Sequence, residues 1–333
     1  MASSVEMTNN QRLFHASCFM LHDTPKIIFL GTPEFALPAL EALIKHGLAP
    51  AFVITQPDKP VGRKQNLSPP PVKALALANN LEVLQPENKK ELQRVFNENE
   101  ADVCVLVAYG MIVPDDVIDK PRPGFLNLHP SLLPKYRGSS PIQTALLNGD
   151  KKTGISIIRL TNQVDAGPIL VQRELAVQED DNAEILHDKL ANLGAELLIE
   201  ILPKYLSGEV EPVPQDGSKA TYTEMIKRED GAINWSKTAL EIKRQFRAFY
   251  PWPGIFTHLD KKRLKIANLS VLEGDFKANL APGQVFLGQN QELAVKCGDG
   301  AVSLISVQLE GKKEMTAEEF LRGQKELVGK ILE

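Results

Sequence analysis

Between residues 26 and 202, short apolar runs alternate with segments in which apolar residues recur every three or four positions. The runs indicate buried strands, and the periodic segments indicate amphipathic helices. This alternation predicts βαβ units, and therefore an α/β domain with a Rossmann-like, mostly parallel sheet covered on both faces. The strands are expected at 26–30, 51–54, 103–108, 125–129, 155–160 and 169–171, and the helices at 32–47, 74–80, 89–99, 142–148 and 183–202.

The alternation ends near Leu202, where a stretch rich in Pro, Gly and charged residues begins. One helix is then expected at 238–249, followed by short strands at 255–259, 264–272, 284–287, 293–296 and 302–308. Short strands separated by glycine-bearing turns predict a small OB-like β-barrel. We therefore expect a disordered leader at 1–25, a first domain at 26–205, a linker at 206–231 and a second domain at 232–333.

Composition narrows the class of protein. Of the 333 residues, 43% are hydrophobic and 24% are charged, which is typical of a folded globular chain. No apolar run approaches the roughly 20 residues that span a bilayer, so we expect no membrane partner. Cys18, Cys104 and Cys297 form no CxxC pair, which excludes a disulfide framework and a cysteine zinc site. We expect a cytoplasmic protein without a metal.

The strand expected at 125–129 carries polar residues near its end. Asn127 and His129 are two positions apart and therefore project to one side of the strand. Pro130 ends this strand at the carboxyl edge of the sheet, where open α/β folds bind ligands. An amide donor beside an imidazole can stabilise an oxyanion and transfer a proton. Asp165 follows the strand expected at 155–160 and can orient the imidazole if that strand joins the same sheet.

Each of these residues also has a simpler explanation. A lone histidine is usually structural, and Asp165 before Gly167 is typical of an Asx turn. Gly31 is the only glycine at the first strand-to-helix junction, whereas a dinucleotide site needs several, and the chain has no phosphate-binding P-loop. An enzyme that uses nicotinamide or ATP is therefore disfavoured.

The net charge of −4 is unevenly distributed along the chain. Residues 237–265 contain eight Lys or Arg residues against two acidic residues, Glu241 and Asp260. A basic segment of this kind can contact a polyanion, although a solvated face is the more common explanation.

Several motifs resemble those of the 10-formyltetrahydrofolate-dependent formyltransferases, and in particular the family that acts on methionyl-tRNA. They extend from about residue 26 to the C-terminus and comprise GTPEF (31–35), QPDKP (56–60), VAYG (107–110), NLHPSLLPKYRG (127–138), PIQ (141–143), DAG (165–167), INW (233–235) and RAFYPWP (247–253). The Asn-x-His-x-Ser-Leu-Leu-Pro core is common to the formyl-folate enzymes. The loop at 56–73 and the second domain resemble the tRNA-specific branch alone.

The resemblance implies transfer of a formyl group from the co-substrate 10-formyltetrahydrofolate to the free amino group of initiator methionyl-tRNA, for translation initiation. We expect the enzyme to be a monomer and to need no metal. The resemblance also implies that Asn127, His129 and Asp165 are catalytic. The folate-site residues that it implies are Val107, Ala108, Tyr109, Gly110, Ser131, Leu132, Leu133 and Pro134. The tRNA contacts that it suggests are Lys59, Arg63, Lys64, Arg244, Arg247, Lys261, Lys262 and Arg263.

Three places depart from the family pattern: Ala166 replaces a usual threonine, Ser139-Ser140 replaces Ala-Ala, and Tyr250 replaces a common asparagine. Two alternatives stay open. The acceptor can be a sugar nucleotide or a ribonucleotide, which the basic loop at 57–68 and the basic second domain disfavour. The chain can also be an RNA-binding module without activity, which the intact Asn127, His129 and Asp165 disfavour.

Overall fold

The computed structural model describes residues 24–61, 66–121, 123–274, 279–324 and 326–333. Residues 1–23 of the expected leader, together with Arg63 and Lys64, lie outside the described residues. The chain divides into two compact units. The first contains the described residues up to Asn127 together with Ala195–Val213, and the second contains Leu128–Gly194 and Pro214–Glu333.

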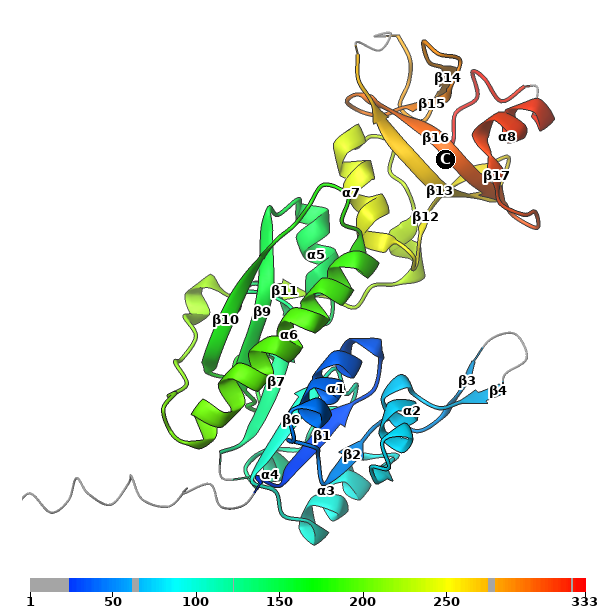
Figure 1. The fold of residues 1–333 in the computed structure, drawn as a ribbon. Coiled ribbons are helices and arrows are strands. Elements are labelled where there is room, and N and C mark those ends of the chain that lie inside the picture. The colour runs from blue at the N-terminus through cyan, green and yellow to red at the C-terminus, as the bar shows by residue number, and fades with distance from the viewer. Residues whose placement is uncertain (1–23, 62–65, 122, 275–278, 325) are drawn as a thin grey trace, which may run out of the picture. The chain divides into compact units, whose positions relative to one another are not determined.

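The first unit is built on parallel strands (Figure 1). Most of the apolar side chains on these strands are buried. β1 (Ile27–Gly31) lies between β2 (Phe52–Ile54) and β6 (Val103–Val107), and β5 (Val83–Leu84) pairs with β2. β7 (Phe125–His129) pairs with β6, with Leu106 opposite Asn127. The other elements of this unit are α1 (Leu37–Lys45), α2 (Pro71–Ala78), α3 (Lys89–Glu98), α4 (Asp115–Ile118) and the hairpin β3 (Lys59–Val61) and β4 (Asn66–Ser68).

The residues Thr32-Pro33-Glu34 have the sequence typical of a helix start, with Thr32 as the predicted N-cap, but the α-helix expected at 32–47 begins five residues later. A 3-10 turn, η1 (Glu34–Ala36), follows β1, and α1 starts at Leu37. The Thr32 hydroxyl caps no helix, because it donates a hydrogen bond to the carbonyl of Tyr109 at 2.7 Å. The prediction of an N-cap at Thr32 was therefore wrong, and this side chain instead links the segments that follow β1 and β6.

The second unit contains the antiparallel hairpin of β9 (Lys152–Arg159) and β10 (Ile169–Ala176), which the connecting residues 160–168 join. Hydrogen-bonded neighbours in the large sheet follow the order β10-β9-β7-β6-β1-β2-β5. A second, two-stranded pairing joins β8 (Arg137–Gly138) to β11 (Tyr222–Thr223), so the segment expected as a linker contributes a strand beside residues 137–138. The helices and turns here are α5 (Pro141–Asn148), η2 (Gly217–Lys219), η3 (Arg228–Gly231) and the part of α6 (Ala183–Leu206) up to Gly194, since the rest of α6 belongs to the first unit.

The C-terminal part of the second unit is an antiparallel half-barrel. Its strands follow the order β12-β13-β16-β15-β14, and β17 pairs with β16. Helix α7 (Ala239–Phe249) packs against β12, β13 and α5, and α8 (Ala317–Gly323) packs against β16. The strands are β12 (Ile255–Leu259), β13 (Lys262–Leu272), β14 (Val285–Leu287), β15 (Leu293–Lys296), β16 (Ala301–Leu309) and β17 (Met315–Thr316). The expected fold class, a Rossmann-like sheet followed by a small OB-like β-domain, is confirmed.

Candidate active site

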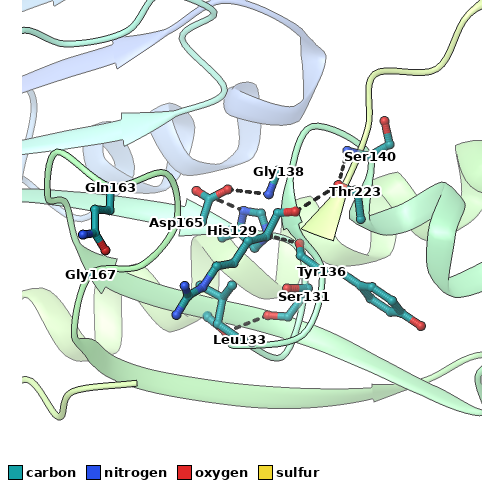
Figure 2. A network of polar contacts seen from close by, with 12 residues as sticks. His129, Ser131, Leu133, Tyr136, Gly138, Ser140, Gln163, Asp165, Gly167 and Thr223 are labelled. Carbon is teal, nitrogen blue, oxygen red and sulfur yellow. Dashed lines mark hydrogen bonds and ion pairs between the residues drawn. The ribbon is translucent and has the colours of Figure 1, made fainter. Parts of the chain in front are cut away.

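The last residue of β7, His129, is fixed through both nitrogens of its ring. Nε2 donates a hydrogen bond to the carbonyl of Tyr136 at 2.9 Å, since a carbonyl can only accept. Nδ1 lies 3.5 Å from Oδ1 of Asp165, and the two side chains are 5% and 13% exposed (Figure 2). Each nitrogen of the ring therefore has an oxygen atom beside it. Asn127, two residues earlier on the same strand, is also buried.

The Asp165 carboxylate is held from a distant part of the sequence. Oδ2 accepts a hydrogen bond from the backbone N–H of Gly138 at 2.8 Å, which leaves Oδ1 beside the imidazole (Figure 2). The carboxylate therefore does more than shape its own turn. The Asp165 backbone has φ +50°, which aspartate tolerates better than most residues. Two residues on, a Cβ at Gly167 would lie 1.8 Å from the carbonyl oxygen of Arg159, so only glycine fits there.

Gln215 fixes the loop that carries Asp165. Its Nε2 donates to the carbonyls of Asp165 and Gly167 at 2.8 and 2.7 Å. Its Oε1 accepts from Nε and Nη2 of the buried Arg137 at 3.1 and 2.7 Å. One amide thus ties the Asp165 loop to the segment that follows β7. The sequence analysis missed Gln215, because it lies in a Pro- and Gly-rich segment without periodicity.

The expected folate residues 131–134 form a turn that is hydrogen-bonded to the β9–β10 hairpin. The Ser156 hydroxyl donates to the carbonyl of Ser131 at 2.6 Å, and Gln172 Nε2 donates to the carbonyl of Leu133 at 2.9 Å. Ser131 and Leu133 are buried, whereas Leu132 and Pro134 are half-exposed. The side chains that a ligand can reach are therefore those of Leu132 and Pro134.

The other expected folate residues are 107–110. Val107 is the last residue of β6, and the other three residues follow it in the first unit. Val107 and Tyr109 are buried, whereas Ala108 (φ +48°) and Gly110 (φ +86°) are exposed. The Tyr109 hydroxyl has no hydrogen-bond partner among the described residues, and burial raises the pKa of this phenol. A buried donor without a partner is costly unless a ligand or water supplies one.

Comparisons with known proteins identify the family of this chain. A family model described as "Formyl transferase" matches residues 25–202, and one described as "Formyl transferase, C-terminal domain" matches residues 225–325. The chain is 45% identical to a methionyl-tRNA formyltransferase of Thermodesulfovibrio yellowstonii over 90% of this chain and 96% of that protein. It is 44% identical to a methionyl-tRNA formyltransferase of Caldanaerobacter subterraneus over 92% and 99%. The chain belongs to the methionyl-tRNA formyltransferase family.

Among solved structures, an N-formyltransferase from Helicobacter canadensis in complex with folinic acid and dTDP-3-aminofucose has the same fold. The TM-score is 0.64 at 21% identity, and the match covers 84% of this chain and 98% of that protein. The family that the motifs predicted is confirmed by the curated relatives, and this formyltransferase shares its fold with an N-formyltransferase whose structure contains an amino-sugar nucleotide.

The basic residues expected to contact tRNA differ in their surroundings. Lys59 is exposed on β3 of the first unit, and Lys261 and Lys262 are exposed at the turn between β12 and β13. The Arg263 guanidinium lies 3.8 Å from the centre of the Phe256 ring. Arg247 donates from Nε and Nη2 to the carbonyls of Asp181 and Gln178, both at 2.6 Å, so it anchors α7 of this formyltransferase.

Within the described ranges, no three His, Cys, Asp or Glu side chains lie close enough together to hold a metal ion. No helix in the part of the chain that the structure describes combines the length and the apolar character needed to cross a membrane.

Proposed function

We propose that this chain transfers the formyl group of 10-formyltetrahydrofolate to the free amino group of initiator methionyl-tRNA. The product is N-formylmethionyl-tRNA for translation initiation in the cytoplasm, and the enzyme acts as a monomer without a metal. The observation that carries the proposal is the 3.5 Å approach of Asp165 to the His129 ring at the end of β7, in a chain of this family.

The folate would be held by residues 107–110 and 131–134. When bound, 10-formyltetrahydrofolate supplies a formyl group whose carbon can accept an amine. The residues present suit such a ligand, because Leu132 and Pro134 offer half-exposed apolar surface. The unpartnered Tyr109 hydroxyl, in the other segment, offers a buried polar atom for the polar groups of a folate. The exposed Ala108 and Gly110 flank it and leave their backbone accessible.

Asn127 and His129 would act on the formyl oxygen. They are two residues apart on β7, so their side chains project to one side of the strand. The Asn127 amide can donate a hydrogen bond to the oxygen on which negative charge grows. The His129 imidazolium adds positive charge nearby. Loss of one such donor lowers the rate by about 10²–10³ in comparable acyl-transfer sites.

Asp165 would hold the charge on His129 and receive the proton that the amine releases, through water. Oδ1 of the carboxylate lies 3.5 Å from Nδ1 of the ring. The Gly138 N–H occupies Oδ2, so Oδ1 is the oxygen that faces the ring. Gln215 keeps the loop in this position through two backbone carbonyls.

Basic residues outside this site would bind the tRNA. We propose that Lys59, Arg63, Lys64, Arg244, Lys261, Lys262 and Arg263 contact phosphates or the end of the acceptor stem, and that Arg247 contributes through its anchoring of α7. Such contacts make affinity fall steeply with salt.

A single-turnover assay tests the acceptor. The purified protein is mixed with 10-formyltetrahydrofolate and, in separate reactions, methionyl initiator tRNA, methionyl elongator tRNA and an amino-sugar nucleotide. We expect formylation of the initiator tRNA at the highest rate. A product formed from the sugar nucleotide alone would overturn the proposed acceptor. Gel filtration with light scattering checks the monomer.

A further inference from the structure

The second unit contains a cavity of about 270 Å³ that is distinct from the His129–Asp165 site. Its walls come from the end of α5, from the residues that follow β10, and from α7. All of these elements belong to one compact unit. The volume lies just below the roughly 300 Å³ at which pockets for whole small molecules begin, so it suits a single charged group.

Basic side chains outnumber acidic ones on the cavity wall. The basic residues are Lys151, Lys243, Arg244 and Arg247, and the acidic residues are Asp150 and Glu179. Like charges gathered at one concavity repel each other unless an anion is present. The affinity of the cavity for an anion therefore depends on which of these charges the protein itself already neutralises.

Both acidic residues are already engaged. The Asp150 carboxylate accepts hydrogen bonds from Lys135 Nζ at 2.7 Å and from the Tyr136 hydroxyl at 2.8 Å. Glu179 interacts electrostatically with Arg247, whose guanidinium also donates to two backbone carbonyls. The two acidic side chains and the guanidinium of Arg247 therefore already have partners within the protein.

Among the described residues, Lys151 and Lys243 have no such partner, and Arg244 has only the electrostatic attraction of Glu241 on its own helix. Within the described residues, Lys151, Lys243 and Arg244 make no ion pair and no side-chain hydrogen bond. Arg244 packs against Gly149, which ends α5 with φ +67°, and a Cβ at Gly149 would lie 2.4 Å from the guanidinium carbon. The carbonyl end of α5 offsets only part of a unit charge. Arg244 is thus packed in place on the cavity wall. Glu241, on the same helix, attracts it but already accepts hydrogen bonds from the backbone N–H and the hydroxyl of Thr238.

We propose that this cavity binds one backbone phosphate of the bound tRNA, through Lys151, Lys243 and Arg244. A phosphodiester supplies a negative charge opposite the three cations, and its oxygens can accept hydrogen bonds from all of them. The identity of the nucleic acid rests on the proposed function, whereas the binding of a phosphate group rests on the cavity itself. Lys151 and Lys243 are thereby added to the residues that the sequence analysis selected.

The test measures binding of initiator tRNA directly, without formylation. Filter binding at several KCl concentrations compares the wild-type protein with the Lys243→Gln/Arg244→Gln variant. The matched control is Lys312→Gln/Lys313→Gln, which removes two exposed lysines between β16 and β17 of the same unit. We expect the cavity variant to bind about tenfold more weakly, with the slope of log K against log salt reduced by about 1. The control should bind like the wild type.

Three further measurements keep the outcome decisive. Lys151→Gln alone, which alters no helix, should weaken tRNA binding in the same direction if the cavity variant folds poorly. The KM for folate should stay unchanged in both variants. If the cavity variant matches the control, the proposal is overturned. It is also overturned if inorganic phosphate alone binds saturably in a Lys243- and Arg244-dependent way while tRNA affinity is unaffected, because the site then serves a free anion.

The two proposals fail in different ways. A wild-type protein that binds tRNA in a cavity-dependent way but formylates no methionyl-tRNA contradicts the proposed function alone. A protein that formylates methionyl-tRNA at the same KM with or without the cavity cations contradicts the cavity alone.

Discussion

The side-chain nitrogen of Gln215 lies 2.8 Å from the backbone carbonyl oxygen of Asp165, although 50 residues separate them in the chain. The same nitrogen reaches the carbonyl of Gly167, and the side-chain oxygen of Gln215 accepts from Arg137. The position of the Asp165 loop therefore depends on a donor from the segment between α6 and η2. This makes Gln215 a positioning residue that does not itself touch the His129 ring.

Gln215→Glu separates the two halves of this contact. A carboxylate still accepts from Arg137, but it can no longer donate to the carbonyls of Asp165 and Gly167. Two lost hydrogen bonds at about 1 kcal/mol each predict a kcat that is roughly 10- to 100-fold lower, with both KM values within threefold. Steady-state kinetics measures this split. Gln163→Glu, on the exposed side of the same loop, is the control and should leave kcat unchanged.

Asp165→Asn removes the negative charge beside His129 and keeps the size of the side chain. We expect kcat to fall by about 10²–10³ with little change in the KM for either substrate. Asp188→Asn is a matched control, because Asp188 also lies beside a histidine, 2.9 Å from Nδ1 of His187, but on the surface. A loss of less than tenfold for Asp165→Asn, or an equal loss for the control, would contradict the catalytic role.

Arg247→Ala should act on stability. The guanidinium donates two hydrogen bonds to carbonyls at 2.6 Å, and bonds from a charged donor contribute about 1.5–3 kcal/mol each. One of the two bonds is exposed to solvent and contributes less. We therefore expect a loss of about 2–4 kcal/mol in the free energy of unfolding, below the sum for two buried bonds, measured by urea denaturation. Lys262→Ala, at an exposed position of the half-barrel, should stay within about 0.5 kcal/mol of the wild type. Equal stabilities of the two variants would disprove the anchoring role.

Arg63→Ala should raise the KM for tRNA and leave the KM for folate unchanged, because the loop at 57–68 resembles the family's acceptor-stem insertion. This prediction rests on the sequence alone, since Arg63 lies outside the described residues. Initial rates at varied tRNA and at varied folate give the two constants. A rise in the KM for folate instead would contradict the prediction that this loop contacts the tRNA.

Cys297 predicts a specific pH dependence. Burial raises the pKa of its thiol from 9.0 to about 11, so the folded protein keeps this proton at a pH where the unfolded chain releases it. The unfolded chain thus binds fewer protons above pH 9, and stability must fall as the pH rises from 9 towards 11. Urea denaturation at pH 8 and pH 10.5 should show a loss on the order of 2 kcal/mol from this group. The loss should be smaller in Cys297→Ala, and equal losses in both proteins would exclude Cys297 as the cause.

Strands with continuous apolar runs could be placed from the sequence. β7, β12 and β15 begin and end where the pattern predicts, because Pro130 or polar turn residues bound each run. β10 extends five residues beyond the expected end, since its later residues alternate between polar and apolar and form a half-exposed strand. β11 has only two residues, which is too short for any periodic pattern.

The candidate site could be predicted only in part. Asn127 and His129 lie two apart on one strand, so their common side follows from strand geometry alone. The approach of Asp165 depended on whether its strand joined the same sheet, and the structure supplies that condition. The use of Thr32 as a donor to Tyr109, and of Gln215 as a clamp, could not be predicted, because both are long-range contacts of residues whose local sequence suggests a cap or a linker.

Tyr136 takes part in both sites through different atoms. Its carbonyl accepts from the His129 ring, and its hydroxyl donates to Asp150 on the cavity wall. Phenylalanine at this position would keep the first contact and lose the second, whereas a change in the backbone here would disturb the imidazole. Residue 136 therefore serves the imidazole through its main chain and the cavity wall through its side chain, so one position couples the two sites.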